Sequence, residues 1–438
     1  FVTVLYSQNL FNPLESRLYF RGLSTPSLSL LSAVPVSVWH LLLMRPARVY
    51  IFLTIMTVTS SAIQSINALR VAVLGSGISG SAAARSLAEK GVKVTVFEAG
   101  RGVGGRMSTR RTRDEHNYQF DHGAQYIGSP KTDAFRHTLD QWKSDDWVRE
   151  WTGDFWTVGG DGRSQEMKKD RWVGYPTMNS ICQNLLSHEN IEIKTQTRAN
   201  ASRIQNGDTD NTCVWQLNHH KTHEALGSFD WLVASDRNSA GYHRNDLAKA
   251  DVKEFTSGTT RNIKSVKSLT AMVVFEHLNM NVNGIQFDGR DPKFGSLGWA
   301  ARDTSKPGRE RTDNRECWVL QSHPDAAKEL LKGKRNIGAI REMARDVLVR
   351  DFLKSIPHIV DNDDDELQLQ VPNVVTSIGH RWGAAFPIPS EECAQMQSQI
   401  IASKQFVACG DYFGQLPGRI EGGYLSGVSA ADQLCDAI

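Results

Sequence analysis

The chain has 438 residues and a mass of 48.8 kDa, which is enough to bury sizeable cores and to form two or three domains. This size excludes peptide hormones and disulfide-stapled miniproteins. The 50 Lys and Arg residues nearly balance the 48 Asp and Glu residues, so no global field favours nucleic acid or a membrane surface as the partner.

Residues 1–69 are rich in Ser, Leu and Val, contain a single acidic residue and show no sustained helical or strand period. This composition predicts a targeting segment that is removed, rather than a folded domain. Met44 is an alternative start, because residues 44–48 are basic, 49–58 are apolar and 59–62 are small, as in a secretory signal. The apolar run is too short to span a bilayer, so we expect no stable transmembrane anchor.

The leader leaves the compartment open between two destinations. A secretory signal sends the protein into the secretory pathway, whereas the whole Ser- and Arg-rich stretch has the composition of an organelle transit peptide, such as that of a plastid. If the leader is upstream translation instead, the protein is cytoplasmic.

The first chemical motif begins at residue 70. Residues 70–74 form a short apolar run typical of a buried parallel strand, and the glycine-rich turn 75–80 follows directly. A helix is expected over about 78–90 and a second strand over 92–97, which ends at Glu98. Strand, glycine turn, helix, strand and acid in this spacing predict a dinucleotide-binding unit.

Each residue of this unit has an expected role. Gly75 makes the tight turn, Gly77 lets a pyrophosphate approach the backbone at the helix N-terminus, and Gly80 allows close packing of helix and strand. Glu98 is expected to accept hydrogen bonds from the adenosine ribose and to disfavour a 2′-phosphate there. The predicted cofactor contacts of the unit are Gly75, Gly77, Ile78, Ser79, Gly80 and Glu98.

A second glycine-rich, basic segment, residues 100–110, follows Glu98 and contains Gly104, Gly105 and Arg106. An extended FAD molecule runs past the first glycine turn and needs such a cationic stretch with an accessible backbone. A typical NAD site would continue directly into another helix. The segment therefore favours FAD over NAD, and we expect all three residues to contact the cofactor.

The C-terminal end supplies the third part of the predicted site. Residues 406–411 are typical of a buried strand that ends in Gly410 and Asp411, and a helix rich in small residues opens at Glu421 and Gly422. A carboxylate at a strand end can bind ribityl hydroxyls, and a helix N-terminus can stabilise negative charge on a reduced flavin. Both ends of the chain are therefore expected to build one FAD site.

Five motifs together resemble the renalase family, which belongs to the flavin amine oxidase superfamily. These motifs are residues 104–110, 120–126, 299–309, 380–382 and 409–411, and the resemblance covers about residues 70–438. It implies an oxidase with non-covalent FAD that acts on dihydronicotinamide isomers of NAD(P)H and passes electrons to O₂, giving H₂O₂. It also implies that Gly123, Ala124 and Gln125 contact the cofactor.

The resemblance implies an α/β fold with a Rossmann-type FAD-binding domain of the two-dinucleotide-binding, hydroxylase-like kind and a second, mixed-sheet substrate domain. Strand-like runs and an amphipathic helix over about 336–353 fit that second domain. Residues 235–237 replace a turn that is apolar and proline-containing in the family. The expected organisation is leader 1–69, FAD-binding domain 70–160, mainly substrate domain 161–399 with a return near 228–240, and FAD-binding domain 400–438.

Several side chains have two interpretations. The tryptophans at 142, 147, 151 and 156 are expected to pack in the core rather than to wall a pocket, and His122 to be a structural neighbour of the cofactor. Lys306 and Arg309 lie in a Pro-Gly turn and are either surface residues or cations near the substrate or flavin. The same alternatives hold for His380 and Arg381. The acidic run 361–366 is expected to be a solvated loop.

A dihydropyridine becomes aromatic when it transfers a hydride to flavin N5, so this reaction requires no strong general base. The sequence offers no evident catalytic dyad, and no catalytic residue is assigned. The six scattered cysteines form no CxxC pair and indicate no metal site. The expected partners are a small-molecule substrate and O₂. The alternatives are a flavin amine oxidase and a flavin-binding protein without turnover.

Overall fold

The computed structural model describes residues 69–438, except 160–161, 166–168, 206–212, 236, 238–245, 248–251, 253–261, 277, 279, 290 and 360–371. The predicted leader, up to residue 68, and the acidic run 361–366 lie outside the described residues. Every helix in the described part of the chain is too short or too polar to cross a membrane.

A six-stranded sheet forms the first layer, in the order β10-β2-β1-β14-β21-β20. All neighbours are parallel except β20, which runs antiparallel to β21. The sheet forms where short apolar runs are buried on both faces, as in β1, whose Val71, Ala72 and Val73 have no exposed surface. The strands are β1 (Arg70–Leu74), β2 (Lys93–Phe97), β10 (Ile191–Lys194), β14 (Trp231–Ala234), β20 (Gln399–Ile401) and β21 (Phe406–Ala408).

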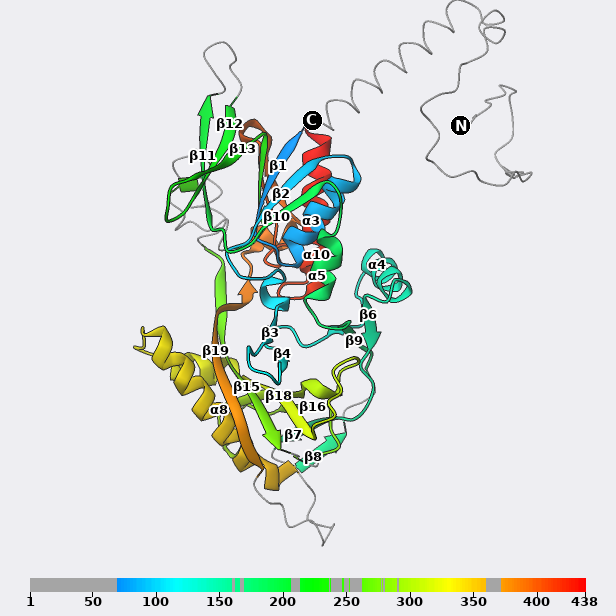
Figure 1. Cartoon of the computed structure of the whole chain (residues 1–438), viewed down its shortest axis with the longest axis vertical. Helices are drawn as coiled ribbons and strands as arrows, with labels where there is room; N and C mark the ends of the chain where they lie inside the picture. The colour runs from blue at the N-terminus through cyan, green and yellow to red at the C-terminus, as the bar shows by residue number, and fades with distance from the viewer. Residues whose placement is uncertain are drawn as a thin grey trace, which may run out of the picture. The chain divides into compact units, whose positions relative to one another are not determined.

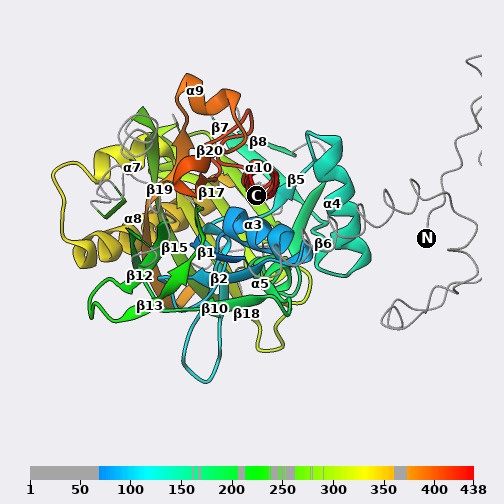
Figure 2. The ribbon, with the colours of Figure 1, turned by 90° about the horizontal axis from the view of Figure 1, so that it is seen from above.

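Helices cover one face of this sheet, and a small sheet covers the other (Figure 1). α3 (Ile78–Glu89), α5 (Ser180–Leu186) and α10 (Ile420–Asp436) lie together on the helical face, as both ribbon views show (Figure 2). α3 and α10 pack so closely at Gly427 that a Cβ there would lie 2.2 Å from the Ser79 carbonyl oxygen. Glycine at this position therefore allows the close packing. The opposite face carries β11 (Ala199–Gln205), β12 (Cys213–His219) and β13 (Ala225–Phe229).

A seven-stranded mixed sheet forms the second part, in the order β19-β15-β18-β17-β16-β7-β8. The long helix α8 (Ile337–Ile359) covers it, and its Phe352 packs against the rings of Phe275 and Trp318, with centroids 5.8 and 5.2 Å away. The strands are β7 (Phe155–Gly159), β8 (Gly162–Gln165), β15 (Lys264–Glu276), β16 (Gly284–Phe287), β17 (Leu297–Arg302), β18 (Arg315–Ser322) and β19 (Asn373–Ile388).

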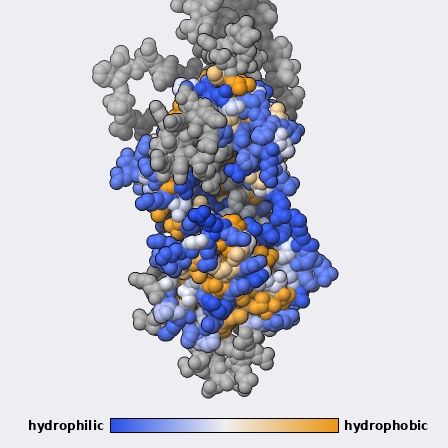
Figure 3. Space-filling view, turned by 90° about the vertical axis from the view of Figure 1, so that its left-hand side faces the viewer, coloured by the Kyte–Doolittle hydropathy of each residue, from blue (hydrophilic) through white to orange (hydrophobic). Residues whose placement is uncertain are grey.

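The remaining described elements belong to neither of these two large sheets. Figure 3 faces the side that carries α8 and β19 and shows a mostly hydrophilic surface with smaller hydrophobic areas between. These elements are the 3-10 turns η2 (Gly105–Met107), η5 (Pro292–Phe294), η6 (Asp303–Ser305) and η7 (Ala402–Lys404), the strands β3 (Thr109–Arg111), β4 (Gln119–Asp121), β5 (Ile127–Gly128), β6 (Val148–Glu150) and β9 (Arg171–Gly174), and the helices α4 (Asp133–Ser144), α7 (Pro324–Leu330) and α9 (Glu391–Gln395).

The predicted fold class is confirmed: the chain is α/β, with a Rossmann-type sheet and a second mixed sheet. The strands are assigned differently from the expected organisation at two points. β10 joins the first sheet along with β14, and β7 belongs to the second sheet although it precedes residue 160. Both strands are short, so the sequence carries little signal for their partners. The tryptophans pack as expected, with Trp142 and Trp151 in the core.

Candidate functional site

A cleft of about 1010 Å³ lies between the carboxyl ends of the first sheet and one face of the second. Gly75 follows β1, Glu98 follows β2, Ser235 follows β14 and Asp411 lies just after β21, and all four line it. Ligands of parallel α/β sheets bind at this edge. The volume is at the upper end of the range for small-molecule sites, about 300–1,000 Å³, so the cleft accommodates a large ligand.

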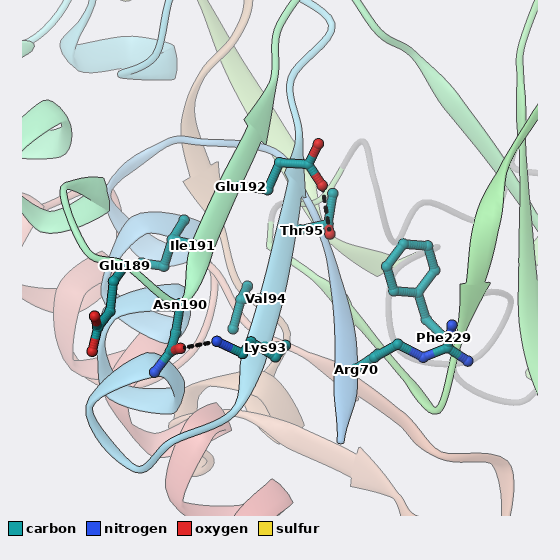
Figure 4. Close-up of a pocket in the computed structure, with 9 residues that line it drawn as sticks. All are labelled: Arg70, Lys93, Val94, Thr95, Glu189, Asn190, Ile191, Glu192 and Phe229. Carbon is teal, nitrogen blue, oxygen red and sulfur yellow. Dashed lines mark hydrogen bonds between the residues drawn. The ribbon is translucent and has the colours of Figure 1, made fainter. Parts of the chain in front are cut away.

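A second pocket lies at the opposite, amino ends of the same strands (Figure 4). It has about 240 Å³ and its polar side chains bind one another: Lys93 Nζ donates to Asn190 Oδ1 over 2.5 Å, and Thr95 Oγ1 to Glu192 Oε2 over 3.5 Å. It is smaller than typical ligand sites. The cleft is therefore the candidate functional site.

The glycines of the first turn differ in what surrounds them. Gly75 has φ +99°, a left-handed conformation that favours glycine. A Cβ on Gly80 would lie 2.1 Å from the Gly75 carbonyl oxygen and 2.7 Å from Ser235 Oγ, so Gly80 is required for packing. A Cβ on Gly77, in contrast, would meet no atom within 4 Å. Gly77 thus leaves open space at the N-terminus of α3, inside the cleft.

Glu98 joins the first glycine turn to the second glycine segment. Its Oε2 accepts hydrogen bonds from the Ser76 backbone N–H (3.0 Å) and hydroxyl (2.6 Å), and its Oε1 accepts one from the Gly100 N–H (2.6 Å). The two segments also touch directly, because a Cβ on Gly105 would lie 3.3 Å from the Gly77 Cα. The cleft therefore has a continuous backbone-lined wall on this side.

Arg106 and Asp411 join the two ends of the chain. The guanidinium donates to both carboxylate oxygens, with Nη1 to Oδ2 at 2.5 Å and Nη2 to Oδ1 at 2.6 Å. Asp411 is 7% exposed, and the Gly410 N–H beside it donates to Ser426 Oγ of α10. The sequence predicts both residues as cofactor contacts but gives no sign of this pair. A bound ligand would share Asp411 with Arg106.

Glu421 and Gly422 have structural roles at the start of α10. The Glu421 carboxylate accepts hydrogen bonds from the Lys131 N–H and from the N–H and hydroxyl of Thr132, at 2.8–3.0 Å. A Cβ on Gly422 would lie 2.2 Å from the Leu416 carbonyl oxygen. Glu421 lines the cleft with its carboxylate already bound, so a cofactor would meet its backbone.

The structure brings thirteen of the sixteen predicted cofactor contacts to the cleft, and Gly80, Gly410 and Gly422 are behind its surface. Gly123 lines the wall, where a Cβ would lie 2.0 Å from the Arg106 carbonyl oxygen. The thirteen are Gly75, Gly77, Ile78, Ser79, Glu98, Gly104, Gly105, Arg106, Gly123, Ala124, Gln125, Asp411 and Glu421.

A cluster of four buried charges supports this wall from behind. Lys306 Nζ lies 2.5 Å from Asp303 Oδ1 and 3.1 Å from Asp121 Oδ2, and Arg309 Nη1 lies 2.8 and 2.5 Å from the Oδ2 atoms of the same acids. Lys306 Nζ also donates to Gln125 Oε1 over 3.3 Å. The surface-loop interpretation of Lys306 and Arg309 is wrong, because the acids that neutralise them allow their burial.

Neighbouring opposite charges hold Asp121 and Arg309 of this cluster in their ionised forms. Burial alone would raise the pKa of Asp121, but Arg309, Lys306 and a hydrogen bond from Thr109 hold it below its ordinary value. Burial would lower the pKa of Arg309, but Asp121 and Asp303 raise it. Neither Lys306 nor Arg309 lines the cleft, so they act on the site only through Gln125 and the wall.

Two histidines and a tryptophan form an aromatic group beside the wall. Trp382 lines the cleft and donates from Nε1 to the His122 carbonyl oxygen over 2.9 Å. Burial lowers the pKa of His122 to about 4, and burial together with His122 lowers the pKa of His380 to about 3. Both rings are therefore neutral near pH 7 and serve as packing groups. His380 and Arg381 do not line the cleft.

Tyr126 and several residues of the second sheet also line the cleft, although the sequence did not predict them as contacts. Tyr126 and Trp299 lie with ring centroids 5.9 Å apart and an interplanar angle of 54°, and Gln286 and Gln321 lie on the strands that flank Trp299. Alternation within the strands could have indicated a common face, but the partner strands and their register are not visible in the sequence.

The described residues that line the cleft include both negatively and positively charged side chains. Glu98, Asp411 and Glu421 are its carboxylates, and each already accepts hydrogen bonds. Arg106, Arg237, Lys267 and Arg419 supply positive charge. Among the described residues, no group of three or more His, Cys, Asp or Glu side chains could hold a metal ion. The cleft suits an anionic ligand better than a cationic one.

Comparison with known proteins agrees with this architecture. Residues 73–142 match the family described as an NAD(P)-binding Rossmann-like domain. The fold is similar to that of a putative protoporphyrinogen oxidase from Exiguobacterium, with 11% identity, a TM-score of 0.57 and coverage of 84% of this chain and 98% of the other. It is also similar to that of a cyclohexylamine oxidase from Brevibacterium oxydans, with 11% identity, a TM-score of 0.56 and coverage of 84% and 99%.

A double mutant of putrescine oxidase gives a similar result, with 10% identity, a TM-score of 0.57 and coverage of 84% of this chain and 99% of the other. At these identities the likeness establishes the fold. The chain therefore has a Rossmann-type dinucleotide-binding domain within the two-part fold that these oxidases share.

Proposed function

We propose that the chain is an oxidoreductase that binds FAD non-covalently in this cleft. The observation that carries the proposal is the continuous lining that begins at the open Gly77, passes Glu98 and Gly105 and reaches the Arg106–Asp411 pair. An extended dinucleotide needs such a path, with backbone N–H groups for its phosphates and polar groups for its hydroxyls.

The residues present fit FAD. Gly77 and the N-terminus of α3 would receive the pyrophosphate, and Glu98 at the end of β2 would bind the adenosine ribose. Asp411 would bind the ribityl chain, while the backbone at the start of α10 would face the flavin. None of the six cysteines stands in a recognisable flavin-linking motif, which supports non-covalent binding.

We infer that the substrate is a dihydronicotinamide isomer of NAD(P)H, as the resemblance to renalase implies. Positive lining residues and the absence of an unpaired carboxylate among the described lining residues suit a phosphate-bearing substrate. Bound FAD would accept a hydride from the dihydropyridine and pass two electrons to O₂, which gives H₂O₂. Tyr126 and Trp299 would hold the substrate ring and exclude water.

An amine is the second candidate substrate. The aromatic pair of Tyr126 and Trp299 favours it, because aromatic faces attract cations, and relatives in fold are named as putrescine and cyclohexylamine oxidases. The positive lining of the cleft opposes it. The third possibility is a flavin-binding protein without turnover.

The full-length protein should be yellow and should release intact FAD when precipitated with acid. In air it should produce H₂O₂ from the 2- or 6-dihydro isomers of NAD(P), and little from ordinary NADH, because the pocket must place the hydridic carbon against the flavin and about 1 Å of misplacement costs roughly 100-fold in rate. H₂O₂ production from primary amines alone would support an amine oxidase. If no candidate substrate gave H₂O₂, the result would support a flavin-binding protein without turnover.

We also propose that the leader directs the protein to the secretory pathway or a plastid. A reporter fused to residues 44–69 should reach one of these compartments, with the reporter alone as the control. A fusion that stays diffuse in the cytosol would contradict this proposal and leave the enzymatic one untouched.

A further inference from the structure

Three cleft residues form a row across the second sheet. Gln286 of β16 is the register partner of Trp299 in β17, and Trp299 is the register partner of Gln321 in β18. Register partners of adjacent antiparallel strands point to the same face, with Cβ atoms about 5 Å apart. All three line the cleft, and Trp299 is the middle residue of the row, with a glutamine on each side.

The hydrogen bonds of Gln321 fix which amide atom is available to a ligand. Its Nε2 donates to the Gly123 carbonyl oxygen over 2.8 Å. A backbone carbonyl only accepts, so the NH₂ group must face it and the Oε1 atom is the acceptor left for another partner. Within the described part of the chain, no residue donates to this Oε1. Gln321 is half-buried, whereas Gln286 is exposed.

Gln286 has the same orientation for the same reason. Its Nε2 donates to the Gly298 carbonyl oxygen over 2.7 Å and to the Phe287 carbonyl oxygen over 3.3 Å. The row thus offers a ligand an aromatic face with an acceptor on each side. Its complement is a planar ring that carries an N–H donor in its own plane.

We infer that Gln321 determines specificity by accepting a hydrogen bond from a primary carboxamide on a substrate ring that packs on Trp299. The inference rests on the proposed function and adds the residue that reads the substituent of the ring. A carboxylate in place of the carboxamide would place two acceptors against each other, and an acetyl group would leave Oε1 without a donor. Both are rejected for lack of an N–H.

The Gln321→Met variant removes the acceptor with little change in shape. The Gly123 carbonyl oxygen keeps a donor in this variant, because Gln125 Nε2 also donates to it over 3.1 Å. The wall should therefore hold, and FAD content should equal that of the wild type. Gln141→Met is the matched control, since it makes the same substitution at an exposed glutamine of α4 that does not line the cleft.

The experiment compares the binding of oxidised nicotinamide dinucleotide with that of its 3-acetylpyridine analogue to the FAD-loaded protein, by calorimetry. The wild type and Gln141→Met should prefer nicotinamide by about 10-fold, the effect of one unsatisfied acceptor, and Gln321→Met should show a ratio near one. The dihydro forms should give the same ratios in kcat/KM.

Two outcomes overturn the inference alone: equal affinities in the wild type, or a preference that persists in Gln321→Met while the dihydronicotinamide isomers still reduce the flavin. If neither dinucleotide binds and the isomers leave the flavin oxidised, the proposed function fails as well. The reduction assay therefore separates the two failures.

Discussion

The two halves of the cleft are built by different means. The half formed by the first sheet presents backbone: Gly77 leaves open space, Gly105 lies against it, and the carboxylates there are already bound by the protein. The half formed by the second sheet presents side chains in register, with Gln286, Trp299 and Gln321 as its centre. Substitutions of the glycines in the first half should act by steric exclusion and be nearly all-or-none, whereas substitutions of side chains that would contact the ligand should have graded effects.

The largest effect is expected for Gly77→Val. Gly77 has φ −70° and ψ 179°, which valine adopts freely, and a Cβ would meet no protein atom. The variant should fold, with a circular dichroism spectrum like that of the wild type, yet retain no FAD. Gly80→Val is the matched control and should fail to fold, because its Cβ would lie 2.1 Å from the Gly75 carbonyl oxygen. A yellow Gly77→Val protein would show that the cofactor lies elsewhere.

The next effect tests the connection between the halves. Lys306→Met leaves Asp121 and Asp303 buried with Arg309 as the remaining cation of the cluster. Breaking a buried ion pair in this way should lower the free energy of unfolding in urea by about 3–5 kcal/mol. Lys293→Met, at an exposed lysine, should change it by less than about 0.5 kcal/mol. Equal stabilities would mean that the cluster does not hold the wall.

The glycine turn could be predicted from the sequence, whereas the buried charge cluster could not. Gly75, Gly77, Gly80 and Glu98 lie within one short stretch whose spacing is set by a strand, a turn and a helix, so their arrangement was predictable. The burial of Lys306 was not, because the Asp121 that neutralises it is 185 positions away and a Pro-Gly turn alone indicates a surface loop.

The same limit applies to the rest of the site. The Arg106–Asp411 pair spans 305 positions, although both members were predicted as cofactor contacts. Gln321 and Trp299 meet only through strand register, which composition does not encode locally. Motifs within one βαβ unit were therefore recoverable from the sequence, and side chains brought together by sheet pairing were not.

A pH effect of intermediate size is expected from the aromatic group beside Trp382. The pKa of His122 is lowered to about 4 by burial, against about 6.5 in the unfolded chain. Between these values the unfolded state binds the proton and the folded state does not, so stability falls as the pH falls from 6.5 to 4. The loss from His122 should be about 3 kcal/mol.

Thermal unfolding at several pH values measures this effect. His122→Phe should lessen the decline between pH 6.5 and 4, and the part that remains should come from His380, whose pKa is lowered to about 3. The loss due to Asp121, whose pKa lies below its ordinary value, should appear only at lower pH. An unchanged slope in His122→Phe would assign the decline to other groups.

A smaller, graded effect is expected for Asp411→Ala. Loss of this carboxylate removes a hydrogen-bond partner of Arg106 and of the proposed ribityl chain, and should weaken FAD binding by about 1–3 kcal/mol. Titration of the apoprotein with FAD measures the change. Asp432→Ala, which removes an exposed acid of α10, should leave FAD affinity unaltered. Equal affinities of Asp411→Ala and the wild type would exclude Asp411 from the cofactor site.

Anaerobic rapid mixing of the FAD-loaded, full-length protein with candidate reductants tests the central claim most directly, because it joins both halves of the cleft in one reaction. One equivalent of a 2- or 6-dihydro isomer of NAD(P) should bleach the flavin absorption band rapidly and completely, and ordinary NADH should do so slowly or not at all. Rapid bleaching by a primary amine, with both isomers inert, would contradict the account and assign the protein as an amine oxidase.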